Sequence, residues 1–204
     1  VLTVPTAFER PDTGWPLVLY AHGTGGDVDS CKWSVAEDLS KEGMAILCIE
    51  QPLHGERGDP SWFIELLTFN FANPRAGRTN FRQSAADTIV LTRMVSDGQF
   101  DLPANTTNHD EAVSFDPAQM HFFGHSQGGL SGALALGVEP SLNSAVLSGA
   151  GGVLIETILR RKDFADIASL VRALLEVPDA NFGAFHPTMT LVQLLVDATD
   201  PVNY

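Results

Sequence analysis

The sequence predicts an α/β protein in which helices cover a doubly wound, mostly parallel sheet. Apolar runs of strand length lie at residues 17–21, 44–49, 120–123 and 144–148. Such runs lack the polar alternation of half-exposed strands, as expected for parallel strands that are buried on both faces. Segments with helical periodicity separate the runs, and glycine-rich turns follow several of them, where open sheets of this class bind ligands.

The first half of the chain alternates strand and helix. Residues 1–16 are rich in turn-forming residues and lead into the strand at 17–21. A helix is expected at 33–43, and the strand at 44–49 follows it directly. A turn at residues 50–55 then lies at the carboxyl edge of the sheet. It contains His54, which we interpret as a structural residue rather than a catalytic base.

Residues 56–78 interrupt this alternation. The segment 62–71 is aromatic and apolar, yet it lies between polar turns at 58–60 and 73–75. Such a segment either fills the core or overhangs a pocket. Because it lies between a strand and a helix, at the active edge of the sheet, we favour a lid.

The second half of the chain begins with a helix at 80–97 and a long loop, before the strand at 120–123. A short helix at 130–136 and the strand at 144–148 follow. Residues 153–200 are helical in pattern and are expected to cap the sheet with amphipathic helices. No internal repeat, low-complexity tract or linker divides the chain, so residues 1–204 are predicted to form a single domain.

The strongest chemical signal is the sequence GHSQG at residues 124–128, directly after an apolar strand. This G-x-S-x-G pattern is typical of a serine turned sharply between a strand and a helix, where flanking glycines avoid collisions with neighbouring backbone. The turn would lift the Ser126 hydroxyl above the sheet. It would also place the Gln127 N–H at a helix N-terminus, facing a developing oxyanion. We therefore interpret Ser126 as a nucleophile rather than as part of a plain glycine-rich turn.

A second glycine-rich loop, HGTGG at residues 22–26, follows the strand at 17–21. Its flexible backbone can direct N–H groups toward a site at the sheet edge. Thr24 is the predicted second oxyanion donor, with the Gly25 N–H as the alternative. A phosphate-binding loop would need a Gly-Lys-Ser/Thr ending, which is absent from this loop.

Composition restricts the class of partner. The formal net charge of −13 argues against a nucleic-acid partner, which would require a basic face. No apolar run reaches the roughly 18 residues of a membrane span, and no signal peptide precedes the first strand. The chain starts at Val1 without methionine, so processing or trimming is expected.

The two cysteines are too few to indicate a zinc site, and no motif indicates a metal or a cofactor. Cys48 lies in an apolar strand, which favours a buried free thiol over a Cys31–Cys48 disulfide. The sequence does not determine the cellular location, and we weakly favour a secreted or extracytoplasmic protein.

The order of these elements resembles the α/β-hydrolase family, and its esterase and lipase branch in particular. The resemblance covers residues 15–150 and depends on the motifs at 22–26 and 124–129, with the turn at 51–55 also similar. It implies a nucleophile elbow at Ser126 and an oxyanion hole formed by Thr24 and Gln127. It further implies hydrolysis of carboxylic esters through an acyl-enzyme.

The sequence departs from this family after residue 148, where the acid and the histidine of the triad would lie on loops after two further strands. The only histidine downstream of Ser126 is His186, in a turn between predicted helices, and Asp163, Asp166 and Asp179 precede it. A local triad from these residues is disfavoured, because carboxylates on helix surfaces are usually only solvated. We expect the chain to be truncated at its C-terminus, so that a further part of the protein or a second chain supplies the acid and the histidine.

Three functions follow from these observations. The leading prediction is an esterase for a small-molecule ester with an apolar acyl or alcohol group, because the segment 62–71 and the helices after residue 153 are apolar. An acyltransferase or peptidase would use the same serine with another acceptor or leaving group. A non-catalytic protein of the same fold would bind a ligand or partner without a histidine.

Overall fold

The computed structural model describes residues 1–32, 35–59, 63–106, 111–162, 166–174, 176–178 and 182–204. Five strands form one sheet in the order β1-β3-β2-β4-β5. Only β1 runs antiparallel to its neighbour; the other strands pair in parallel. The strands are β1 (Leu2–Thr3), β2 (Trp15–Ala21), β3 (Ala45–Ile49), β4 (Phe115–His125) and β5 (Ser144–Ser148). The predicted mostly parallel sheet is therefore confirmed.

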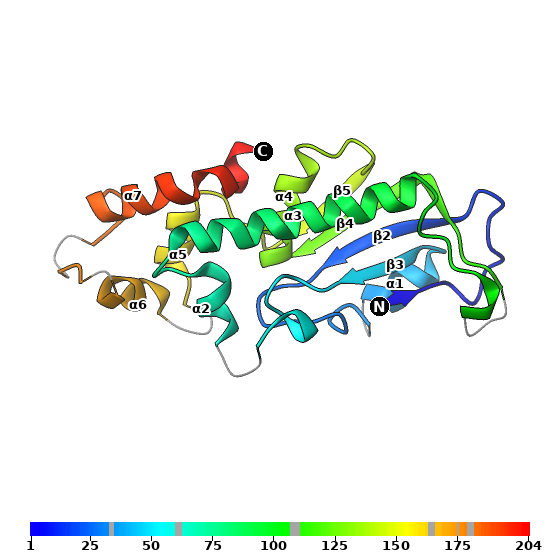
Figure 1. Cartoon of the computed structure of the whole chain (residues 1–204), viewed down its shortest axis with the longest axis horizontal. Helices are drawn as coiled ribbons and strands as arrows, with labels where there is room; N and C mark the ends of the chain where they lie inside the picture. Colours follow the sequence, from blue (N-terminus) through cyan, green and yellow to red (C-terminus); the bar gives the residue numbers. More distant parts are fainter. Residues whose placement is uncertain (33–34, 60–62, 107–110, 163–165, 175, 179–181) are drawn as a thin grey trace.

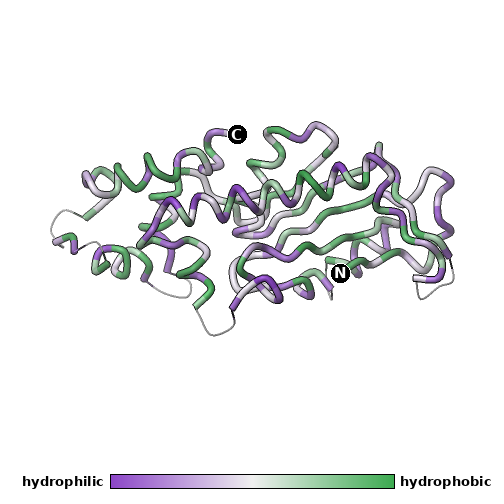
Figure 2. Tube along the Cα trace, in the orientation of Figure 1, coloured by the Kyte–Doolittle hydropathy of each residue, from purple (hydrophilic) through white to green (hydrophobic). Residues whose placement is uncertain are grey.

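Helices cover both faces of the sheet, as Figure 1 shows. The helices that cover the two faces are α1 (Val35–Lys41), α3 (Pro74–Ser96) and α4 (Gln127–Leu136). Alternate residues of β2 point to opposite faces. Val18 and Tyr20 pack in the cluster that includes Ala36 of α1, whereas Leu17 and Leu19 pack in the cluster that includes Val95 of α3. Figure 2 shows the central strands as mostly hydrophobic, in agreement with burial on both sides.

Helix α3 is longer than its predicted range of 80–97. It begins at Pro74, and the Asn73 side chain accepts a hydrogen bond from the Ala76 N–H. The polar sequence at 73–75, interpreted above as a turn, is therefore a helix start, since proline at the first helical position costs no hydrogen bond. Helix α1 ends at Lys41, before the predicted end at Gly43. Trp33, the predicted first residue of this helix, lies outside the described residues.

The remaining helices gather beyond one end of the sheet, at the left in Figure 1. They are α2 (Ile64–Phe69), α5 (Leu154–Arg160), α6 (Ile167–Leu174) and α7 (Pro187–Val196). Phe71 packs there with buried residues of the other segments, including Ile158, Val171 and Met189. Segments 56–78 and 153–200 thus share an apolar cluster separate from the sheet core. Their role as a lid or cap stays a prediction, and Trp62 lies outside the described residues.

Short 3₁₀ turns complete the described chain. They are η1 (Gly55–Arg57), η2 (Ala104–Thr106), η4 (Asp197–Thr199) and η5 (Pro201–Asn203). None of the described helices combines the length and the apolar character needed to cross a membrane.

Strand β5 forms an open edge of the sheet. It pairs with β4 on one side, and no further strand pairs with it in the described part of the chain. The Val146 side chain is 56% exposed and that of Leu147 is 38% exposed. An edge strand with exposed apolar side chains can accept another strand.

The prediction of a free thiol at Cys48 is wrong, because Cys31 and Cys48 form a disulfide. Cys31 precedes α1 and Cys48 lies on the face of β3 that packs with α1, and their Cα atoms are 6.4 Å apart. Both cysteines remain buried in the cluster beneath α1. The apolar surroundings of Cys48 therefore did not distinguish a thiol from a bridged cysteine.

Candidate active site around Ser126

Ser126 occupies the sharp junction between β4 and α4. Its backbone has φ 51° and ψ −112°, a conformation that residues with a side chain rarely adopt and that surrounding contacts must maintain. The Ser126 N–H donates to the Ser148 carbonyl at 2.8 Å, and its own carbonyl accepts from the Leu130 N–H at 3.0 Å. These contacts with β5 and α4 hold the strained residue on both sides.

The glycines around Ser126 are required by close backbone approach. A Cβ atom on Gly128 would lie 2.1 Å from the Ala21 carbonyl oxygen, on the central strand β2. A Cβ on Gly124 would lie 2.4 Å from the Gly128 carbonyl oxygen. Helix α4 therefore starts closer to the sheet than any side chain would permit, which is the reason given above for the G-x-S-x-G spacing.

The loop at residues 22–26 lies directly against Ser126. A Cβ atom on Gly23 would be 3.1 Å from the Ser126 Cβ. The Gly128 N–H donates to the His22 carbonyl at 3.1 Å, and Thr24 Oγ1 donates to Gln127 Oε1 at 2.8 Å. The structure thus brings together the three residues singled out in the sequence: Ser126, Thr24 and Gln127.

The backbone N–H groups predicted to bind an oxyanion differ in whether they already make a hydrogen bond. Those of Thr24 and Gln127 make no hydrogen bond with another described residue. The Gly25 N–H, the alternative donor, is already bound to His54 Nε2 at 3.1 Å. Thr24 and Gln127 therefore remain as the two candidate donors to a negatively charged oxygen near Ser126.

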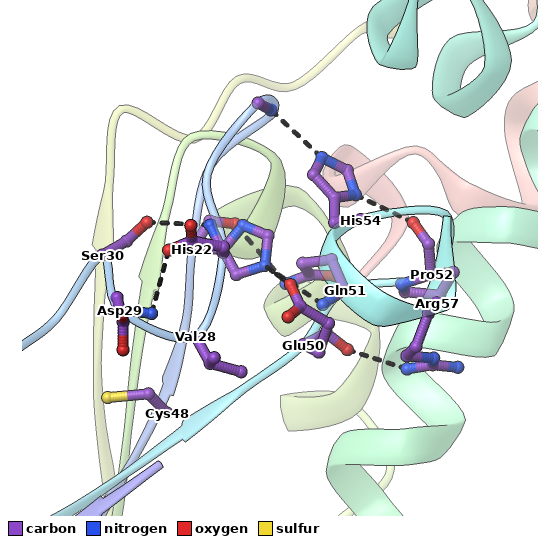
Figure 3. A network of polar contacts seen from close by, with 12 residues as sticks. His22, Val28, Asp29, Ser30, Cys48, Glu50, Gln51, Pro52, His54 and Arg57 are labelled. Carbon is purple, nitrogen blue, oxygen red and sulfur yellow. Dashed lines mark hydrogen bonds and ion pairs between the residues drawn. The ribbon is translucent and has the colours of Figure 1, made fainter. Parts of the chain in front are cut away.

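A network of buried polar side chains contacts the loop at residues 22–26 (Figure 3). His22 is buried; its Nδ1 lies 2.8 Å from the Gly23 carbonyl, and its Nε2 accepts from the Gln51 N–H at 3.1 Å. Glu50 Oε1 lies 3.1 Å from the same Nε2. The network continues from the Gln51 side chain through Ser84 of α3 to Ser131 of α4. It connects the ends of β2 and β3 to α4, the helix that follows Ser126.

His54 is the member of this network that sequence reasoning undervalued. Its side chain is fully buried, and its Nδ1 lies 2.9 Å from the Pro52 carbonyl. Burial lowers the pKa of His54 below its usual value, with a further lowering from His22 and opposing contributions from the Pro52 hydrogen bond and Glu65. The signal in the sequence was its place in a turn at the carboxyl end of a buried strand, beside the glycine-rich loop.

No histidine ring among the described residues is hydrogen-bonded to Ser126 Oγ. His125 is exposed, and the Nδ1 of His186 caps α7 by accepting from the Thr188 N–H at 3.2 Å. Asp166 accepts from the Ser169 N–H at the start of α6. His109, Asp163 and Asp179 lie outside the described residues. The described residues around Ser126 thus include a candidate nucleophile and two candidate oxyanion donors, and no histidine hydrogen-bonded to the nucleophile.

Within the same residues, no group of three or more His, Cys, Asp or Glu side chains is arranged to hold a metal ion.

Two solved structures have the same fold. The chain is similar to the acetyl xylan esterase from Paenibacillus sp. R4, with a TM-score of 0.65 at 15% identity, over 99% of this chain and 58% of that one. It is also similar to acetyl xylan esterase 1 from Thermoanaerobacterium sp. JW/SL YS485, with a TM-score of 0.62 at 14% identity, over 95% of this chain and 57% of that one. The chain therefore has the α/β-hydrolase fold and spans somewhat more than half the length of these enzymes. Neither a family model nor a curated protein sequence matches it.

Proposed function

We propose that the protein is a serine carboxylester hydrolase in which Ser126 is the nucleophile at a nucleophile elbow. The observation that carries the proposal is the backbone of Ser126, held at φ 51° between β4 and α4 directly against the loop at 22–26. A strained serine that is supported by so many backbone contacts is typical of a functional site. The fold shared with two esterases is compatible with this chemistry.

The reaction would proceed through an acyl-enzyme. Ser126 Oγ attacks the ester carbonyl as a base removes its proton, and the carbonyl oxygen becomes negatively charged. The Thr24 and Gln127 N–H groups form the oxyanion hole for this oxygen, and the N-terminus of α4 adds a favourable dipole. After the alcohol leaves, water attacks the acyl group and releases the acid and Ser126.

The base and the acid that orients it would come from outside the described residues. We propose that they lie on a further part of the protein that docks at the open edge of β5, or on a second chain. Support comes from the exposed apolar side chains of β5 and from the longer chains of the two esterases. Ser148, at the end of this edge strand, is hydrogen-bonded to Ser126, so a strand added here would end near the nucleophile.

The substrate would be an ester with an apolar group. Leu66 and Phe69 of α2 and Ile158 of α5 line an apolar crevice, and Glu65 also belongs to its lining. A Cβ atom on Gly25 would lie 3.7 Å from Glu65 Oε1, so the crevice adjoins the oxyanion loop. The disulfide favours an extracytoplasmic location, because such bonds persist in oxidising compartments.

A second candidate is a binding protein of the same fold without catalysis. The absence of a base near Ser126 in the described residues favours it. An acyltransferase or a peptidase would keep Ser126 and differ only in the acceptor or the leaving group.

Hydrolysis of nitrophenyl esters of increasing acyl length by the full-length protein tests the proposal. We expect activity that rises beyond the acetyl ester and that falls by about 10⁶-fold in Ser126→Ala, as for other serine hydrolases that lose the nucleophile. A Ser141→Ala variant, changed outside the site, serves as the control. Ser126→Ala with near wild-type activity, or a wild-type protein without any, would overturn the assignment.

A further inference from the structure

We propose that His54 is a positioning residue that holds the oxyanion loop, residues 22–26, in its active form by accepting a hydrogen bond from the Gly25 N–H. The inference rests on the proposed esterase function, because it assigns His54 a role at the same site. His54 does not contact the reacting atoms; it acts through the loop that carries Thr24.

The hydrogen bonds of His54 define its tautomer. The Pro52 carbonyl can only accept, so Nδ1, at 2.9 Å from it, carries the proton. Nε2 is then a lone-pair acceptor, and the Gly25 N–H donates to it at 3.1 Å. The ring is fully buried. Figure 3 shows its hydrogen bond with Pro52. His54 thus connects the turn after β3 to the loop after β2.

The loop is held at three of its residues. The His22 carbonyl accepts from the Gly128 N–H, the Thr24 hydroxyl donates to Gln127 Oε1, and the Gly25 N–H donates to His54. Gly25 has φ 80°, a conformation open chiefly to glycine. The His54 contact constrains the peptide unit between Thr24 and Gly25, and with it the orientation of the adjoining Thr24 N–H. Of the three contacts, it alone involves a titratable group.

The surroundings of His54 keep it neutral near pH 7. Burial lowers its pKa below the usual value of about 6.5. The His22 ring, 5.0 Å away, also lowers the pKa of His54, whereas Glu65 of α2 raises it. Glu50 faces this pair through its contact with His22 Nε2.

Protonation of His54 would abolish its role. An imidazolium carries a proton on both ring nitrogens, so Nε2 could no longer accept from Gly25. Because the pKa is lowered in the folded protein, the unfolded chain binds this proton first. The contribution of His54 to folding stability is therefore complete above pH ~6.5 and is lost as the pH falls from there toward the lower pKa of the folded state. The oxyanion loop would lose its anchor as His54 becomes protonated.

Two variants separate the two hydrogen bonds of His54. In His54→Gln the side-chain oxygen can reach the position of Nε2 and accept the Gly25 N–H without titrating. In His54→Asn the shorter amide can donate to Pro52 but does not reach Gly25. We expect His54→Asn to reduce kcat by ~10- to 100-fold with little change in KM, as for partial loss of an oxyanion donor. We expect His54→Gln to stay within ~3-fold of wild type and to lose the acidic fall in kcat that His54 causes.

The Gly25 amide provides a measurement that does not depend on activity. In ¹H–¹⁵N spectra of the full-length protein, we expect slow hydrogen exchange of this amide at neutral pH in wild type and His54→Gln. We expect fast exchange in His54→Asn, and in wild type once the pH falls below the pKa of His54.

Equal kcat values in the two variants, or a Gly25 amide that stays protected through the titration of His54, would overturn the inference. If His54→Asn fails to fold, the comparison of wild type with His54→Gln across the pH range still decides it. If the wild-type protein hydrolyses no ester, the proposed function fails, while the Gly25 amide still shows whether His54 anchors the loop.

Discussion

Substituting Gly128 by alanine perturbs the site at its tightest point. The added Cβ would lie 2.1 Å from the Ala21 carbonyl oxygen and 2.5 Å from the Ala21 carbonyl carbon. Both atoms belong to the backbone of β2, which is buried between β3 and β4 and cannot move independently. Helix α4 must therefore shift away from the sheet. This shift would weaken the hydrogen bond from the Gly128 N–H to the His22 carbonyl.

The loss of folding stability in Gly128→Ala can be estimated from the contact between this Cβ and the Ala21 backbone. Overpacking of a well-packed core costs about 1–3 kcal/mol, and here only backbone can give way, so we expect the upper end of that range. For a domain of this size, a loss of about 3 kcal/mol lowers the Tm by roughly 6–12 °C. Because Gln127 would move with the helix, we also expect ester hydrolysis to fall by more than ~10-fold.

Urea denaturation and nitrophenyl ester hydrolysis measure the two effects. Gly183→Ala is the matched control, because a Cβ there meets no atom within 4 Å and the residue has an ordinary φ. Its stability should stay within about 0.5 kcal/mol of wild type. Wild-type stability in Gly128→Ala would refute the close packing of α4 against β2. Lost stability with full activity would refute the placement of Gln127 in the oxyanion hole.

Two further predictions concern residues that hold the site from a distance. Replacing Cys31 and Cys48 by alanine should lower the free energy of unfolding, measured in urea, by about 3 kcal/mol, because the disulfide closes a loop with a sequence separation of 17. The oxidised and reduced wild-type proteins should differ by a similar amount. Equal stabilities would contradict a bridge. Asp200 is fully buried and accepts hydrogen bonds from the Val153 and Leu154 N–H groups at the start of α5. Asp200→Ala should therefore lower the free energy of unfolding by about 3 kcal/mol or more. Asp197 is exposed, and Asp197→Ala should lower it by less than about 1 kcal/mol. Similar losses in the two aspartate variants would show that the Asp200 contacts contribute little.

The sheet could be predicted from the sequence because its signals are local. The runs near Leu17, Ile46, Phe122 and Val146 are short and apolar, and each lies in an observed strand. The start of α3 was misplaced because a polar Asn-Pro pair is compatible with a turn or with a capped helix.

The site could be predicted in part for a similar reason. Gly124, Ser126 and Gly128 carry a local pattern, and a strand followed by a glycine-rich loop indicates Thr24. The role of His54 depends on contacts between turns that follow different strands, over 29 residues of sequence between His54 and Gly25. The Cys31–Cys48 disulfide depends on how the segment before α1 packs with β3. Neither relation has a signature within a short window of residues.

Covalent labelling of the full-length protein by a fluorophosphonate, followed by mass spectrometry of the peptide that contains Ser126, tests the central claim most directly. A serine that is activated by a base and faces an oxyanion hole should react with one equivalent of the reagent, and only at Ser126. The labelling should disappear in Ser126→Ala and persist in Ser131→Ala, whose hydroxyl is buried in the polar network. A folded wild-type protein in which Ser126 stays unlabelled, or in which another serine takes the label, would contradict the assignment of Ser126 as the nucleophile.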